Sequence, residues 1–227
     1  MRSAVATLVV GLALAVGVPT AWALTRPPAA AGPPVEQVLD APATSAPPST
    51  TSAPPSTAAP VTPAPPPVPV RDASPTPPAV TPAPVRLSVP AVGVDAAVDA
   101  VGVEPDGSMT VPRDVDRVGW YRFGPAPGQP GSAVLAGHVD SATEGLGAMA
   151  PVRSAEVGDE VTVTDESGAT TRWRVVARQE FVKQELPRDE LFARDGPPRL
   201  VLITCGGPFL ADVGSYRDNV VVVAELV

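Results

Sequence analysis

The chain has only one cysteine and one histidine among its 227 residues. A single cysteine excludes an intramolecular disulfide, and the thiolate and imidazole ligands are too few for a zinc site of the Cys/His type. We therefore expect no metal and no cofactor. The sequence also lacks a Lys/Arg cluster and has a formal net charge of −8. It is therefore not expected to bind nucleic acid, because a phosphate backbone attracts a basic surface.

Proline, in contrast, is abundant, with 32 residues. Pro, Ala, Ser and Thr dominate residues 25–84, which contain few aliphatic side chains and almost no charge. Such a stretch cannot bury enough apolar surface to offset its chain entropy. We predict a disordered linker over residues 25–84, acting as a polyproline-rich spacer, and a folded domain over residues 85–227.

Residues 1–24 contain an uncharged apolar run from Ala4 to Leu24, preceded by Arg2. About 20 apolar residues suffice for a transmembrane helix, and the positive charge before them favours an inside amino terminus. We expect a single-pass membrane anchor with the rest of the chain on the cell-wall side. The alternative is a cleaved signal peptide, because Ala21-Trp22-Ala23 fits a cleavage pattern. Both interpretations export the folded domain.

The folded domain is predicted to be all-β. Its short runs rich in Val, Ile, Leu and Thr are separated by Gly- and Pro-containing turns, which is typical of a closed barrel or sandwich. Two short helices are expected over residues 145–151 and 187–193. The predicted strands cover residues 86–92, 132–139, 160–164, 170–177, 199–204 and 219–226.

Three side chains are the candidates for chemistry. Cys205 follows the apolar run Leu200–Thr204 and precedes two glycines, so it lies where a buried strand ends and a loop begins. His138, also at a strand end, is the natural general acid and base for a cysteine nucleophile. Arg217, shortly before the last strand, carries a guanidinium that can stabilise an oxyanion. The structural alternatives are a buried inert thiol, a structural histidine and a solvated surface arginine.

These residues lie in motifs that resemble those of sortases. The segments AVLAGHVDS (133–141), LVLITCGG (200–207) and SYRDNVVVVA (215–224) occur in the sortase order, supported by VGWYRFGPAPG (118–128) and VGDEVTV (157–163). The Gly-Trp-Tyr block and Cys-Gly-Gly are most similar to the class F group of high-GC Gram-positive bacteria. The resemblance implies a closed β-barrel of about eight strands with short helices, following the transmembrane helix and the linker.

The resemblance also implies an activity. Cys205 would cleave an LPXTG-like sorting signal through a thioester, His138 would transfer protons, and Arg217 would stabilise the oxyanion. The acyl group would pass to an amine of peptidoglycan or of a pilin-type protein. Thr204, before the cysteine, and Asn219, two residues after Arg217, are expected to contact the substrate. Arg122 is a more distant alternative to Arg217.

Two other functions remain open from the sequence. An L,D-transpeptidase would carry its histidine close to its cysteine in a Ser-His-Gly-Cys type block, whereas His138 lies far from Cys205 along the chain. A non-catalytic exported β-domain on a Pro-rich stalk, serving adhesion or cell-wall binding, would leave the only thiol and the only imidazole without a shared role.

Overall fold

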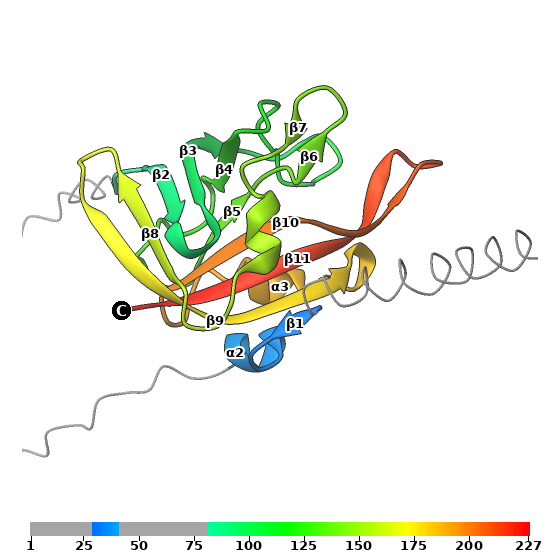
Figure 1. Cartoon of the computed structure of the whole chain (residues 1–227). Helices are drawn as coiled ribbons and strands as arrows, with labels where there is room; N and C mark the ends of the chain where they lie inside the picture. The colour runs from blue at the N-terminus through cyan, green and yellow to red at the C-terminus, as the bar shows by residue number, and fades with distance from the viewer. Residues whose placement is uncertain (1–28, 41–80) are drawn as a thin grey trace, which may run out of the picture. The chain divides into compact units, whose positions relative to one another are not determined.

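The computed structural model describes residues 29–40 and 81–227 (Figure 1). The predicted membrane anchor and most of the predicted linker lie outside these ranges. Within them, no helix combines the length and the apolar character needed to cross a bilayer.

Strands dominate the described part of the chain, as expected. The helical elements are short: α2 (Val35–Asp40), α3 (Arg188–Leu191) and the 3-10 turns η1 (Pro90–Val92), η2 (Ala150–Ser154) and η3 (Lys183–Glu185). The strands are β1 (Ala30–Ala31), β2 (Pro84–Val89), β3 (Val94–Val101), β4 (Arg117–Tyr121), β5 (Ser132–Ala136), β6 (Asp140–Ser141), β7 (Gly145–Leu146), β8 (Glu160–Asp165), β9 (Thr170–Val182), β10 (Arg199–Leu210) and β11 (Ser215–Leu226).

The main sheet closes into a barrel. Its strand order is β9-β11-β10-β5-β4-β3-β2-β8, and β8 pairs in turn with β9. These eight strands form the ring, so the predicted closed barrel of about eight strands is confirmed. Most pairs are antiparallel, but β5 and β10 run parallel, as do β3 and β4. As a result, β5 runs beside the first half of β10 and ends opposite Ile203, while β10 continues to Leu210.

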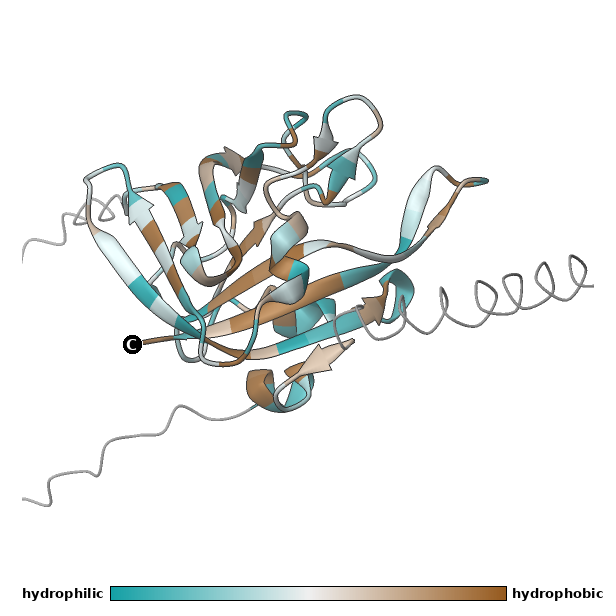
Figure 2. Cartoon of the chain, in the orientation of Figure 1, coloured by the Kyte–Doolittle hydropathy of each residue, from teal (hydrophilic) through white to brown (hydrophobic). Residues whose placement is uncertain are grey.

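Alternation along the strands builds two apolar cores. Leu200 and Leu202 of β10 belong to a cluster with residues from all eight ring strands, which fills the barrel interior. Val201 and Ile203 belong to a second cluster outside the barrel wall, together with α2 and α3 residues. Both faces of β10 over residues 199–204 and of β11 over residues 220–224 are therefore covered, which explains the apolar runs there (Figure 2).

The second core is covered by residues 29–40, which we call the N-terminal strap. Here β1 pairs with β9 through Ala30 opposite Gln179. The following helix α2 buries Val35, Val38 and Leu39 almost completely, at the i, i+3 and i+4 spacing of an amphipathic helix. The strap and the barrel belong to one compact unit.

Polar bonds fix the strap in register. The buried Arg199 guanidinium donates from Nη2 to the Val38 carbonyl at 2.7 Å, and the Val35 amide donates to Gln179 Oε1 at 3.0 Å. Burial lowers the pKa of Arg199, while the carboxylates of Glu225 and Asp40 act in the opposite direction. A guanidinium held this way satisfies a helix carbonyl that would otherwise lack a partner.

The structure differs from the sequence prediction at several places. Strands β3 and β4 were not predicted, and β10 continues past the predicted end at Thr204 to Leu210, so Cys205 lies within a strand and not at its end. The disordered linker expected over residues 25–84 is wrong for residues 29–40 and for Pro84, which opens β2. Three apolar side chains at helical spacing, with the pairing of β1 and the bonds from Arg199 and to Gln179, dock the strap despite the surrounding prolines. The helix expected over residues 145–151 is also wrong, since Gly145 and Leu146 form β7 and the turn η2 begins only at Ala150. The second predicted helix is confirmed as α3.

Candidate active site

Cys205 lies near the end of the parallel pairing between β10 and β5. That pairing runs from Arg199 opposite Ser132 to Ile203 opposite Ala136. Two residues later, Cys205 is half-buried with a free thiol, and on its other side it pairs with Asn219 of β11. The surrounding strand residues are buried, so the backbone of the nucleophile candidate is rigidly supported.

His138 follows directly on β5, at the same edge of the sheet. The Gly137 amide donates to the Ile203 carbonyl at 3.2 Å, and the Thr204 hydroxyl donates to the Gly137 carbonyl at 3.0 Å. These two bonds extend the contact between the strands by one residue beyond the last regular pair. They hold the half-buried His138 beside the part of β10 that carries Cys205.

The backbone around His138 is closely packed. A Cβ at Gly147 would lie 2.5 Å from the His138 carbonyl oxygen and 2.9 Å from that of Val115. Residue 147 must therefore be glycine for the chain to pass this close to the backbone of His138. The Gly147 amide also donates to the Val139 carbonyl at 2.9 Å, so the conformation after His138 is fixed by hydrogen bonds as well as by contact.

Arg217 lies on β11, the other neighbour of β10. Directly opposed residues of antiparallel strands point to one face, and so do residues two apart along a strand. Cys205 and Asn219 therefore share a face of the sheet, while Arg217 lies where the pairing with β10 becomes irregular. Asn219 is half-buried directly opposite Cys205, and the Arg217 side chain is 52% exposed.

The Arg217 guanidinium is oriented by the next residue. Nε donates to Oδ1 of Asp218 and Nη2 donates to Oδ2, both at 2.7 Å. The Asp218 side chain is only 3% exposed, and it raises the pKa of Arg217, with a smaller contribution from Glu180. Two of the five N–H donors of the guanidinium are used in this pair, which leaves three for another acceptor.

The second glycine after the cysteine makes room for this carboxylate. Gly207 has φ of 68°, and a Cβ there would overlap Asp218 Oδ2. The glycine therefore serves both the left-handed backbone and the close approach of Asp218. Sequence reasoning did not assign Asp218 a role, although its place between Arg217 and Asn219 was the available signal.

The remaining predicted residues have different surroundings. Thr204 is 2% exposed, so its hydroxyl joins β10 to the histidine segment, and its predicted contact with substrate stays a prediction. Arg122 lies just beyond β4, stacked 4.9 Å above the Phe123 ring. Because β4 runs antiparallel to β5, with Gly119 opposite Ala136, Arg122 lies away from the His138 end of β5. This placement favours Arg217.

Tyr216 and Asp140 form a further contact at this edge that sequence reasoning missed. The Tyr216 hydroxyl donates to Oδ2 of Asp140, and both residues are half-buried. They flank the predicted site residues, since Asp140 comes two residues after His138 and Tyr216 directly precedes Arg217. The flanking positions were the only sequence signal.

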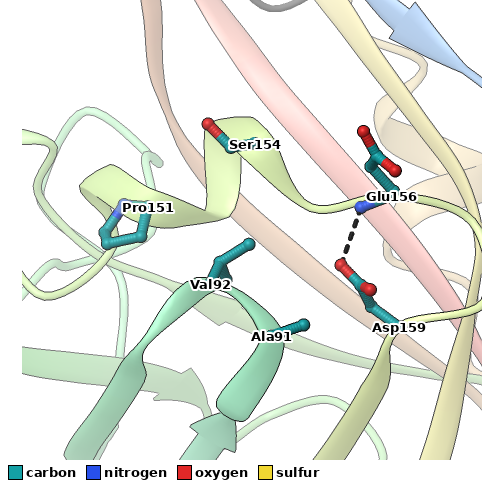
Figure 3. A pocket seen from close by; sticks show the side chains of 6 residues that line it. All are labelled: Ala91, Val92, Pro151, Ser154, Glu156 and Asp159. Carbon is teal, nitrogen blue, oxygen red and sulfur yellow. Dashed lines mark hydrogen bonds between the residues drawn. The ribbon is translucent and has the colours of Figure 1, made fainter.

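A separate cavity lies between η1 and η2 and contains none of the candidate catalytic residues. One of its two carboxylates is bonded to the local backbone, since Asp159 Oδ2 accepts from the Glu156 amide at 2.8 Å (Figure 3). In the described part of the chain, no group of three or more His, Cys, Asp or Glu side chains is arranged to hold a metal ion. The cavity is lined by Ala91, Val92, Pro151, Ser154, Glu156 and Asp159.

Comparisons with known proteins identify the family. The chain resembles the solved sortase A of Listeria monocytogenes with 23% identity and a TM-score of 0.49, covering 64% of this chain and 88% of that one. It resembles sortase C-1 of Actinomyces oris with 21% identity and a TM-score of 0.48, covering 63% and 72%. A search of curated proteins finds no match. The sortase domain model matches residues 87–227, which is more than half of the chain. The chain therefore belongs to the sortase family.

Proposed function

We propose that this protein is a cysteine transpeptidase that cleaves an LPXTG-like sorting signal and transfers the acyl group to an amine. Sortase family membership supports a sortase-type function. The observation that carries the specific proposal is the strand order β11-β10-β5, because it puts the ends bearing Arg217, Cys205 and His138 next to one another. In a β-domain without this activity, the only thiol and the only imidazole would not be expected on neighbouring strands.

The proposed reaction has two halves. The Cys205 thiolate adds to the carbonyl carbon of the signal's threonine, and the C–N bond to the next residue breaks as His138 protonates the departing amine. An acceptor amine then adds to the thioester carbon and gives a proton to His138. The C–S bond breaks, so the new amide forms and the thiolate is restored.

Arg217 is proposed to stabilise the oxyanion in both halves. Its guanidinium is charged at all relevant pH values, and its pairing with buried Asp218 fixes its direction before substrate binds. A donor that is already oriented needs little reorganisation when charge develops on the carbonyl oxygen. Asn219, directly opposite Cys205, is proposed to donate to the substrate backbone on the same face.

The test is a ligation assay with an LPXTG-containing peptide and triglycine as the acceptor. The expected product is the peptide joined through its threonine to triglycine, identified by its mass. Cys205→Ala is expected to give no product, and His138→Gln is expected to lose at least a hundredfold in rate. Ligation by the Cys205→Ala protein at the wild-type rate would contradict the proposed mechanism.

We also propose that residues 4–24 anchor the protein, with the barrel on the cell-wall side. Only residues 25–28 separate the apolar run from the strap, and four residues span at most about 14 Å. Since the strap is docked on the barrel, the barrel would stay close to the anchor. This replaces the interpretation of residues 25–84 as a long spacer. Protease treatment of intact cells should remove the barrel, and protection of the barrel would contradict the proposed orientation.

A further inference from the structure

The hydrogen bond between Tyr216 and Asp140 joins two segments on opposite sides of the cysteine strand. In the barrel, β10 lies between β5 and β11. Asp140 opens β6, two residues after His138 on the extension of β5, while Tyr216 directly precedes Arg217 on β11. The bond therefore crosses β10, beyond Ile203 where the pairing with β5 ends, and it connects the histidine segment to the arginine strand.

The strand geometry accounts for this reach. Pairing between β10 and β11 is regular up to Gly206 opposite Asp218, then shifts in register before Phe209 meets Tyr216. Such an irregularity bends a strand and redirects its side chains. It turns this part of the β10–β11 hairpin so that the tyrosine hydroxyl meets the carboxylate on the far side of β10.

Tyr216 and its neighbour Ser215 make further contacts that fix the position of the phenol. Its ring meets Phe209 edge to face, with centroids 5.3 Å apart, and the preceding Ser215 accepts from Lys183 Nζ at 2.8 Å. The hydrogen bond to Asp140 is the main cause that raises the pKa of Tyr216, and Cys205 acts in the same direction while Arg153 opposes it. The phenol therefore remains protonated and acts as a donor at neutral pH.

We propose that Tyr216 and Asp140 are positioning residues of the proposed transpeptidase, and that their hydrogen bond sets the separation of His138 and Arg217 across Cys205. This inference rests on the proposed function. Neither residue needs to touch the reacting atoms. Proton transfer and oxyanion stabilisation both depend on precise placement. The two segments are otherwise joined through their separate pairings with β10, and the bond adds a direct link between them.

The test compares Tyr216→Phe with Tyr121→Phe, the matched change at the only other tyrosine of the chain. Tyr121 packs against Phe123 and Phe192 through its ring. In the ligation assay, Tyr216→Phe is expected to lower kcat about tenfold with little change in KM, while Tyr121→Phe leaves both unchanged. Asp140→Ala should match Tyr216→Phe, and the double variant should be no slower than either single variant. Asp140→Asn, whose amide oxygen still accepts, should restore part of the rate.

A second readout does not depend on activity. His138 is the only histidine, so the protein gives a single imidazole Hε1 resonance in its NMR spectrum. Tyr216→Phe should shift or broaden this resonance, and Tyr121→Phe should leave it unchanged. An inactive wild-type protein would refute the proposed function but not the positioning role, which this spectrum still tests. The positioning role is overturned by an unchanged imidazole resonance in Tyr216→Phe, or by wild-type kcat in that variant.

Discussion

Replacing Thr204 with valine tests how firmly the histidine segment is held to the cysteine strand. Valine keeps the shape of threonine but removes the hydroxyl that donates to the Gly137 carbonyl. Thr204 is 2% exposed, so water does not replace the lost donor. Losing one partner of a buried hydrogen bond costs about 1–3 kcal/mol. We take about 2 kcal/mol of unfolding free energy as the expected loss, which lowers Tm by about 4–8 °C for a domain of this size.

The assay is thermal and urea unfolding of the wild type, Thr204→Val and Thr204→Ser. Serine keeps the donor and loses a methyl group, which costs about 0.8 kcal/mol, so it should be the more stable of the two variants. Ligation by Thr204→Val should also slow, because Gly137 directly precedes His138. The reasoning is refuted if valine is as stable as threonine while serine is the less stable variant. In that case packing of the methyl group, and not the hydrogen bond, holds the segment.

Three further changes test other parts of the structure. Asp218→Asn should slow ligation about tenfold at nearly constant Tm, because Arg217 loses its charged partner; a wild-type rate would remove the orienting role. Val38→Asp should undock the strap and lower the unfolding free energy by about 3 kcal/mol, and unchanged urea unfolding would show that the strap adds nothing. The hydrogen bond from Arg117 lowers the pKa of Asp99 below its ordinary 3.8. This pair therefore stabilises the fold above that pH and stops doing so as pH falls through the lowered pKa. Asp99→Asn should be less stable than wild type at pH 7, with a difference that vanishes on acidification, whereas a constant difference would refute the assignment.

The strands that could be predicted are those whose side chains carry a strong pattern. The runs that became β10 and β11 are Val- and Leu-rich because both their faces are buried. In contrast, β3 (Val94–Val101) was missed, although Val94, Ala96 and Val98 alternate as a half-buried strand requires. Its alanines and aspartates have low β-propensity, and its stability comes from pairing with β2 and β4.

The strap was missed for a related reason. A Pro- and Ala-rich composition predicts disorder on average, but Val35, Val38 and Leu39 are enough to cover a specific apolar patch. That patch exists only after the barrel has formed, from Val134, Val201 and other residues far along the chain. No local pattern in the sequence could reveal this patch, and so none could show what the strap binds to.

The candidate residues could be named from the sequence, but the contacts around them could not. A sole cysteine, a sole histidine and an arginine before the last strand stood out because each carries distinctive chemistry. The roles of Asp218 and Tyr216 depend on side-chain directions set by a register shift and by a left-handed glycine. Such features arise from the pairing of whole strands and leave only weak local signals.

The central claim is that Cys205 is the nucleophile that takes up the acyl group of a sorting signal. The most direct measurement is the intact mass of the protein after brief reaction with an LPXTG peptide and no acceptor amine, followed by peptide mapping. We predict a mass increase equal to the peptide's acyl part up to its threonine, located on Cys205 and released by hydroxylamine or triglycine. An unmodified Cys205 during observed peptide cleavage, or an acyl group on another residue, would contradict the account.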